Sequence, residues 1–310
     1  MTYNFATIST ESHLHKVFVL YESLYEIDKD VCLHVLITDV DDVGSIESPF
    51  DNVIFYTPHD CCKDNLSQSI LKKYNANADK LRWTMKPVFL LYLLREIMLQ
   101  KVIYVDNDIA FFGAFNFLFK ELSNYNVLLT PHNYSRDPLE NQNWLEANFR
   151  VGLYNAGFVA VNKNAISAIE WWAGCCLYRC QKNYMRGLFD DQKYLDLIPI
   201  IEPKTKVLEH KGCNLAGWNL DICRRGEHNG KVLINGQWPV VFIHFNPTTL
   251  QCFYEDKDPH LMPCFNSYSE MLKKYNVDSD LKQEAFKETY IQKIKLLIWR
   301  LLNRINTVNS

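Results

Sequence analysis

Val102-Ile103-Tyr104-Val105-Asp106-Asn107-Asp108 is the stretch that indicates the fold, and the apolar residues Ile109-Ala110-Phe111-Phe112 follow it directly. A short continuous apolar run is typical of a strand that is buried on both faces of a sheet. In open α/β sheets, ligands gather at the carboxyl ends of such strands. Two carboxylates held there repel each other unless something positive lies between them, and a hard divalent cation with phosphate groups meets that need. The stretch therefore predicts a metal-binding pair, Asp106 and Asp108, at a sheet edge.

The spacing of this pair is not specific by itself, because any short motif recurs by chance. Four other pairs have the same spacing: Asp28/Asp30, Asp39/Asp41, Asp256/Asp258 and Asp278/Asp280. Most of them lie in polar stretches that read as solvated turns, whereas Asp106/Asp108 has strong apolar flanks on both sides. The context favours metal binding, and a solvated strand end is the alternative.

Strand-like and helix-like segments alternate over the first 160 residues. Such alternation predicts an α/β fold, a doubly wound and mainly parallel sheet with helices on its faces. The predicted strands are Tyr3 to Ile8, Cys32 to Ile37, Val53 to Tyr56, Val102 to Val105, Val127 to Leu129 and Phe158 to Val161. The predicted helices include Leu14 to Leu24 and Lys86 to Leu99, with Pro87 in the first turn of the latter.

Composition bounds the class of protein. The chain has 310 residues, is 48% hydrophobic and 22% charged, and so can bury a large core as one domain or as one domain with an appendage. A net charge of −3 argues against nucleic acid as the main partner. No signal peptide and no transmembrane run is recognisable, which predicts a cytoplasmic protein, and the ten cysteines lack any C-x-x-C pair and are expected to be free thiols.

Several segments in order resemble a nucleotide-diphospho-sugar glycosyltransferase of the GT-A fold, similar to glycosyltransferase family 8 and to bacterial capsule and surface-polysaccharide sugar transferases. The matching segments are Arg82-Trp83 with Lys86-Pro87, Lys101 to Phe112, Gly152-Leu153-Tyr154-Asn155-Ala156-Gly157-Phe158, Phe189 to Pro199, Asn214 to Leu220 and Phe242-Ile243-His244-Phe245. The chain departs from family 8 after His244, where Asn246-Pro247 replaces the Gly and Lys-Pro-Trp motif. The resemblance covers roughly residues 1 to 250.

This resemblance implies a set of ligands and of residues that hold them. A divalent cation, Mn²⁺ or Mg²⁺, would be held by Asp106, Asp108 and His244 and would bridge the phosphates of a UDP-sugar, and oxygen ligands with one imidazole suit those ions. The donor would be contacted by Thr7, Ser9, Arg82, Lys86, Asn107, Asn155, Ala156 and Gly157. From local sequence alone, Thr7 and Ser9 equally read as capping residues, and Arg82 and Lys86 as solvated cations on one helix face.

Asp190-Asp191-Gln192 precedes a segment that reads as an apolar-periodic helix, so helix capping by a carboxylate is the simple interpretation. The resemblance places Asp191 and Gln192 beside the anomeric carbon as the catalytic pair. A retaining enzyme would use them to stabilise positive charge or hold the acceptor, an inverting one would need a base, and the resemblance to family 8 favours retention. Acceptor contacts are predicted for Asp190, Asn214, Trp218 and Asn219, while Trp171-Trp172 is expected in a helix packed on the core.

The last segment differs in character from the rest. Residues 290 to 305 form a basic amphipathic pattern, which is typical of a helix lying on an anionic membrane and equally of one packed on its own domain. We therefore expect a catalytic domain at 1–264 and a helical extension at 265–310, in which residues 290–305 either contact the inner face of the cytoplasmic membrane or pack on the domain. The expected partners are a nucleotide sugar and a saccharide or lipid-linked acceptor.

Three other functions fit parts of the pattern. Val102 to Ala110 resembles the first loop of haloacid-dehalogenase-like phosphatases, but that loop normally opens its fold and here about 100 residues precede it. A sugar-phosphate nucleotidyltransferase would share the sheet, yet a glycine-rich loop is missing from Phe5 to Ser12. A non-catalytic sugar-nucleotide-binding module would be expected to have lost several of the site residues named above.

Overall fold

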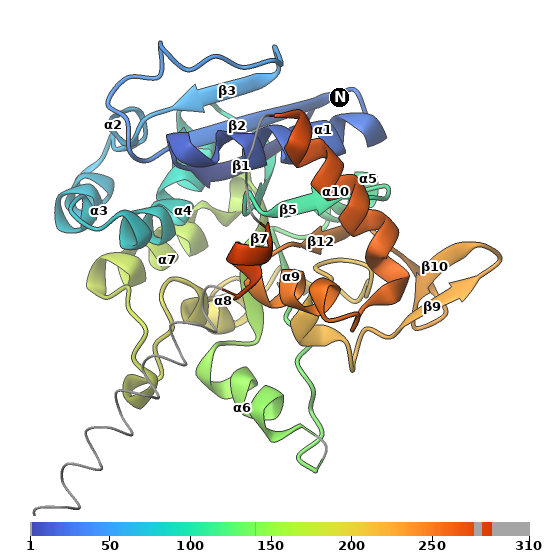
Figure 1. The fold of residues 1–310 in the computed structure, drawn as a ribbon. Coiled ribbons are helices and arrows are strands. Elements are labelled where there is room, and N and C mark those ends of the chain that lie inside the picture. Colours follow the sequence, from blue (N-terminus) through green and yellow to red (C-terminus); the bar gives the residue numbers. More distant parts are fainter. Residues whose placement is uncertain (1, 140, 276–280, 287–310) are drawn as a thin grey trace, which may run out of the picture.

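The computed structural model describes residues 2–139, 141–275 and 281–286, and it is built around one large sheet (Figure 1). The seven strands of this sheet are arranged in the order β3-β2-β1-β4-β7-β6-β8. Their bounds are β1 Tyr3–Ser9, β2 Val31–Ile37, β3 Val53–Tyr56, β4 Lys101–Val105, β6 Val127–Pro131, β7 Tyr154–Asn162 and β8 Thr205–Val207. The sheet is mainly parallel and is flanked by helices, so the predicted doubly wound α/β class is confirmed.

One strand runs against the others, and its direction matters for the site. β1 pairs in parallel with β2 and β4, whereas β7 pairs antiparallel with both β4 and β6. The amino end of β7 therefore lies at the same sheet edge as the carboxyl end of β4. There the backbone N–H of Asp106 donates a hydrogen bond to the carbonyl oxygen of Gly157 (2.9 Å). Polar residues at opposite ends of two strands are thus brought together.

Helices cover both faces of the sheet. Val102 and Tyr104 of β4 pack into the core cluster under α2 (Pro58–Cys61), α3 (Asn65–Tyr74), α4 (Ala78–Arg95) and α7 (Ile166–Tyr178). Ile103 and Val105 face the other core cluster, which is covered by α1 (Leu14–Ile27) and α5 (Asn116–Glu121). Because successive side chains of a strand point to opposite faces, a strand between two such layers must be apolar throughout, as residues 102 to 105 are.

Two helical predictions need correction. The helix expected from Lys86 begins eight residues earlier, at Ala78, where Asn77 caps it by accepting from the N–H of Lys80. Pro87 therefore lies inside α4, not in its first turn. Packing of residues 84–94 in the core offsets the backbone hydrogen bond that a proline removes. The segment after Asp191 is the 3-10 helix η4 (Gln192–Leu197), in which the Asp191 side chain makes no capping hydrogen bond.

A smaller layer closes the carboxyl edge of the sheet. β5 (Ile109–Phe111) and β12 (Phe242–His244) form a two-stranded antiparallel sheet, and α9 (Pro247–Tyr254), η6 (Pro259–Leu261) and α10 (Met262–Lys274) pack against it. The predicted extension begins inside α10, and Phe265 and Tyr268 share a core cluster with Phe245. Residues 290 to 305, where we predict the amphipathic helix, lie outside the described residues.

The remaining elements lie outside the large sheet, and some of them form the rim of its carboxyl edge. They are η1 (Glu11–His13), α6 (Gln142–Arg150), η2 (Lys163–Ala165), η3 (Tyr184–Arg186), α8 (Ile198–Ile201), η5 (Gly217–Asn219), and the antiparallel strands β9 (Arg225–His228), β10 (Lys231–Ile234) and β11 (Trp238–Pro239). Arg225, the first residue of β9, links several of these segments. Its guanidinium lies 3.0 Å from the Asp258 carboxylate and donates to the carbonyl oxygens of Ala216, Asn219 and Cys223.

Arg225→Met should destabilise the protein by about 3–5 kcal/mol, because it leaves the buried Asp258 carboxylate without its counterion. The free energy of unfolding from urea titration measures this loss. The matched control is Arg224→Met, whose residue lies one position earlier in the chain. We expect the control to change the free energy by no more than about 0.5 kcal/mol. Equal stability of the two variants would contradict the role given to Arg225.

Candidate active site

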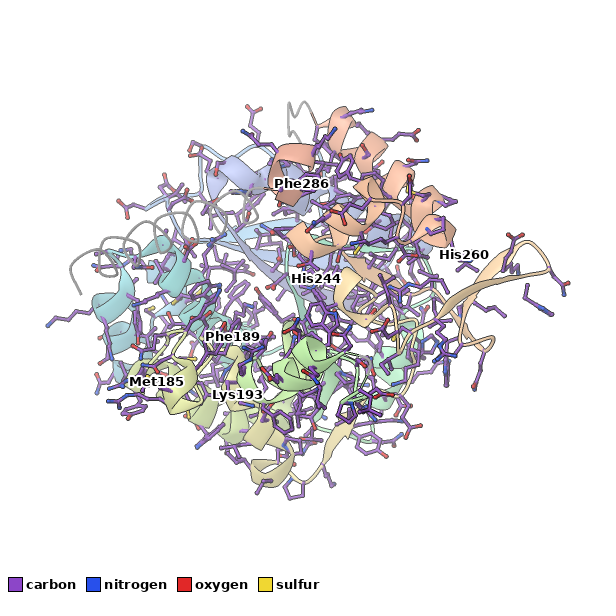
Figure 2. All side chains as sticks on the ribbon, turned by 60° about the horizontal axis from the view of Figure 1, so that its bottom comes forward. Met185, Phe189, Lys193, His244, His260 and Phe286 are labelled. Atoms are coloured by element: carbon purple, nitrogen blue, oxygen red, sulfur yellow. The ribbon has the colours of Figure 1, made fainter. Side chains whose placement is uncertain are left out.

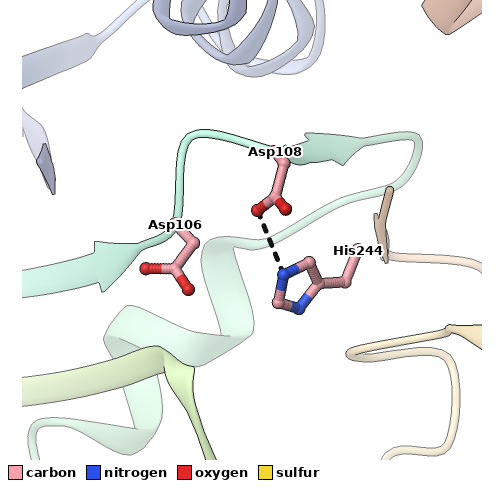
Figure 3. Close-up of side chains that lie close together, drawn as sticks. All are labelled: Asp106, Asp108 and His244. Atoms are coloured by element: carbon pink, nitrogen blue, oxygen red, sulfur yellow. Dashed lines mark ion pairs between the residues drawn. The ribbon is translucent and has the colours of Figure 1, made fainter. Parts of the chain in front are cut away.

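Three potential metal ligands meet at the carboxyl end of β4. Asp106, Asp108 and His244 each offer an atom, and these atoms lie within 4.8 Å of one another (Figure 3). The Nε2 atom of His244 is 3.0 Å from Oδ1 of Asp108. Two carboxylates and one imidazole form a donor set that suits Mn²⁺ or Mg²⁺. The grouping predicted from the sequence is therefore present as a geometric cluster.

The small β5–β12 sheet positions His244 next to the two aspartates. β5 follows Asp108 immediately, and His244 pairs with Ile109 in the antiparallel register. The N–H of Phe245 also donates to the carbonyl oxygen of Asp108 (2.7 Å). The backbone on both sides of His244 is thus held against the D-x-D loop, although more than 130 residues separate them in sequence.

The charges in the trio are strongly coupled. Burial alone would lower the pKa of His244, but the Asp108 carboxylate outweighs it and the pKa is raised. Burial likewise opposes ionisation of Asp108, yet the nearby imidazole holds the pKa of that carboxyl well below its usual range. The pair consequently has a negative carboxylate next to a positive imidazole. A divalent cation could replace the positive charge of the imidazole.

Lys86 is the second positive group of the site. It is buried in α4, and its Nζ atom lies 3.0 Å from Oδ1 of Asp106 and 3.6 Å from Oδ2 of Asp191. It also donates to the carbonyl oxygen of Ala156 (3.2 Å). Burial would lower its pKa, but the two carboxylates raise it, so the amine stays charged. Lys86 therefore links the D-x-D pair to Asp191 and is not a solvated surface cation.

The first residues of β7 line the cluster from the other side. The Nδ2 atom of Asn155 lies 3.2 Å from Nδ1 of His244, which fixes the plane of the imidazole. Its Oδ1 atom accepts from the N–H of Gly157 (2.6 Å). A Cβ on Gly157 would stand 2.8 Å from Cε1 of His244 and 2.9 Å from Oδ2 of Asp106, closer than real contacts allow. Only glycine fits between the two ligands.

The Asp190-Asp191-Gln192 segment faces the same space. Burial raises the pKa of Asp191 to about 6, with Lys86 opposing the shift. Gln192 is held at both ends of its amide, accepting from the N–H of Ala156 (3.1 Å) and donating to the carbonyl oxygen of Val151 (3.3 Å). Asp190 has a left-handed backbone (φ 47°), and its buried Oδ1 atom has no hydrogen-bond partner among the described residues. Strain and an unpaired polar atom together are typical of a functional position.

Two adjoining pockets flank the cluster. One has a volume of about 310 Å³ and is lined by His244, Gln192 and Trp218, among others. The other, of about 140 Å³, lies on the side of Ile8 and Asn107. Both pockets touch Trp83, Lys86 and Asp106. A ligand with two parts could therefore occupy both, with its centre beside Asp106.

The other predicted contacts fall into two groups. Arg82 and Asn107 line the smaller pocket, although Arg82 also pairs with Asp79. Asn107 donates to Ser9 (2.9 Å), so Ser9 orients that side chain. The structure does not bring Ser9 itself or the remaining three to either pocket wall: Thr7, Asn214 and Asn219, like Ser9, are fully buried. The amide of Asn219 is already used within the protein, where it donates to the carbonyl oxygen of Asn214 in its own loop and to that of His132 after β6.

The sequence reasoning missed several pocket residues. Tyr104 donates to Oδ1 of Asp106 (2.8 Å) from within the strand, where it reads as an ordinary core residue. His132, Tyr134 and Trp144 form a parallel stack along the larger pocket, with ring centroids 4.6 and 5.2 Å apart. His132 follows the end of β6, so the rule that ligands gather at strand ends could have pointed to it. No local sequence pattern indicates that Tyr134 or Trp144 lines a pocket.

Comparison with protein sequences finds relatives but no established activity. No family model matches the chain. Two relatives in Bacillus subtilis (strain 168) are uncharacterized proteins. YfnF is 25% identical over 263 residues, which is 84% of this chain and 86% of the relative. YfnD is 28% identical over 255 residues, covering 80% of this chain and 79% of the relative.

Comparison with solved structures identifies the fold. The galactosyltransferase LgtC, solved with donor and acceptor sugar analogues, matches with a TM-score of 0.53 and 14% identity, over 91% of this chain and 99% of LgtC. The apo form of mouse xyloside xylosyltransferase 1 matches with a TM-score of 0.50 and 16% identity, over 80% of this chain and 99% of that enzyme. The chain therefore has the GT-A glycosyltransferase fold, as its motifs predict.

Gly157→Ala should weaken Mn²⁺ binding by roughly tenfold or more, because the new methyl group forces His244 and Asp106 apart. Isothermal titration calorimetry with MnCl₂ measures the affinity. Gly174→Ala is the matched control, since a Cβ there meets nothing within 4 Å. If both variants bind Mn²⁺ like the wild type, the three side chains do not form the metal site.

Proposed function

We propose that the protein is a metal-dependent glycosyltransferase that moves a sugar from a nucleotide diphosphate, UDP first among the candidates, to a saccharide acceptor. The observation that carries this proposal is the convergence of Asp106, Asp108 and His244 between two adjoining pockets on a GT-A fold. The two solved neighbours, named as a galactosyltransferase and a xylosyltransferase, support the same reaction class.

The three residues fit a divalent cation by their chemistry and by their surroundings. Each offers a ligand atom, and Gly157 leaves room between two of the ligands that no larger residue would leave. A bound Mn²⁺ or Mg²⁺ would neutralise, as a Lewis acid, the charge that develops on the departing diphosphate. The chain's part is to orient these ligands, through Asn155 on the imidazole and Tyr104 on Asp106.

In the proposed reaction the bond between the anomeric carbon and the diphosphate oxygen breaks, and the electron pair leaves with the diphosphate. The acceptor hydroxyl then forms the new bond, and its proton passes to the departing diphosphate, which leaves on the same face of the sugar when configuration is retained. Asp191 and Gln192, held by Lys86 and by the N–H of Ala156, lie where they could face the sugar ring. We propose that they stabilise the positively charged transition state, with retention of configuration as in family 8.

The smaller pocket beside Ile8 and Asn107 is our proposed nucleotide site, and the larger pocket would hold the donor sugar and the acceptor. Trp218 and Asp190, which line the larger pocket, are our proposed acceptor contacts. By resemblance, the biological setting would be surface-polysaccharide assembly on the cytoplasmic side of the membrane. None of the described helices is both long and apolar enough to span a bilayer.

Incubation with a panel of UDP-sugars and Mn²⁺, without acceptor, should release UDP from one member of the panel. Release should stop with EDTA and should fall at least roughly a hundredfold in Asp108→Ala, since one ligand of the cation is lost. Coupled detection of UDP measures the rate. Lys282→Ala, remote from the cluster in sequence, controls for preparation effects. Silence across the panel, together with no Mn²⁺-dependent UDP binding, would overturn the assignment of the donor.

A further inference from the structure

A tight turn projects beside the mouth of the larger pocket. Asn183 and Leu188 close it by two backbone hydrogen bonds (2.9 and 3.0 Å), and Gly187 adopts the left-handed conformation that the turn requires (φ 64°). The turn joins α7 to Asp190-Asp191-Gln192. Its tip carries Tyr184, Met185 and Arg186, which form η3. The tip is therefore coupled by a short stretch of chain to the proposed catalytic residues.

Two of the three side chains at this tip, those of Tyr184 and Met185, are largely apolar and open to solvent. Met185 is 100% exposed and Tyr184 is 56% exposed. The turn lies next to α6, because the guanidinium of Arg150 is 6.0 Å from the Tyr184 ring, and the preceding residue of that helix, Phe149, is 70% exposed. In Figure 2, Met185 lies toward the edge of this face, and Phe189 lies between it and His244. Large apolar side chains that gather on an exposed face mark an interaction surface.

The charge along the chain that forms the turn is one-sided. From Trp171 to Phe189 the sequence contains Arg179, Lys182 and Arg186 and no acidic residue, although the whole chain has a net charge of −3. Lys182 pairs with Asp190 at 3.8 Å. Within residues 2–139, 141–275 and 281–286, no carboxylate forms an ion pair with Arg179 or Arg186. The surface therefore combines exposed apolar side chains with uncompensated positive charge.

We propose that the turn 183–188, together with Phe149, docks the protein on an anionic phospholipid surface. Aromatic and aliphatic side chains inserted at the headgroup boundary, next to arginines that bind lipid phosphates, are the combination that membrane interfaces select. A protein partner is disfavoured because the apolar side chains stand on separate projecting elements, whereas stable protein interfaces have a contiguous packed centre. This surface consists of described residues and is independent of the predicted helix at 290–305.

The position of the turn gives the docking a consequence for the substrate. Lys182 and Phe189, on either side of the turn, both line the larger pocket. A bilayer that holds the tip would therefore lie beside the pocket mouth, and the acceptor would be a saccharide carried on a membrane lipid. This second statement rests on the proposed transferase function, whereas the docking itself does not.

Flotation of the full chain tests the docking. It uses phosphatidylcholine vesicles and vesicles that also contain about 30 mol% of the anionic lipid phosphatidylglycerol. The wild type should float with the anionic vesicles. Tyr184→Ser/Met185→Ser should reduce the bound fraction roughly tenfold, and Arg186→Gln roughly fivefold. The matched control is Ile97→Ser/Met98→Ser, two consecutive exposed apolar residues (36% and 67%) ahead of β4, at the opposite edge of the sheet.

Three outcomes would overturn the proposal. The wild type could fail to float, the tip variant could float as well as the Ile97→Ser/Met98→Ser control, or all forms could bind neutral and anionic vesicles equally. Binding through residues 290 to 305 alone would give the second outcome. The flotation uses no sugar nucleotide, so its result is independent of the UDP-release assay. A tip-dependent flotation with no UDP release would keep the docking and remove the acceptor assignment.

Discussion

The structure depends on keeping two carboxylates together at the buried end of β4. Asp106 and Asp108 would repel each other in that environment without positive partners. Lys86 provides one partner from α4, at 3.0 Å from Asp106, and the imidazole of His244 provides another, at 3.0 Å from Asp108. The same lysine reaches Asp191, so the charge balance of the D-x-D pair also positions the proposed catalytic segment. Removing either positive group would leave a partly buried negative charge without its partner.

Two departures from a simple parallel sheet make this balance possible. The antiparallel direction of β7 brings Asn155 and Gly157 to the edge where β4 ends. The short β5–β12 sheet then holds His244 against the D-x-D loop. In both features it is the pairing of strands that brings the residues together, so residues far apart in sequence meet within a few ångströms. The rim elements that close the edge are fixed in turn by buried contacts such as Arg225 with Asp258.

Much of this arrangement is predictable from the sequence because its signals are local. The apolar run of residues 102 to 105 and the carboxylates behind it indicate a buried strand with ligands at its end, and the structure has that strand at Lys101–Val105. The direction of β7 could not be predicted, since Phe158 to Val161 is apolar in either orientation. Pro87 misled the prediction of α4, because packing outweighs the local cost of a proline. The pairing of His244 with Asp108 required the family resemblance, as no local pattern links them.

The central claim is that Asp106, Asp108 and His244 together bind a divalent cation that holds the nucleotide diphosphate. Anomalous diffraction from crystals grown with MnCl₂ and UDP tests it most directly, because manganese is located by its own scattering. We expect one strong peak at about 2.0–2.3 Å from an oxygen of each carboxylate and from Nε2 of His244, with UDP phosphates beside it. A peak held by other residues, or UDP bound in the pocket with no peak at this trio, would contradict the account.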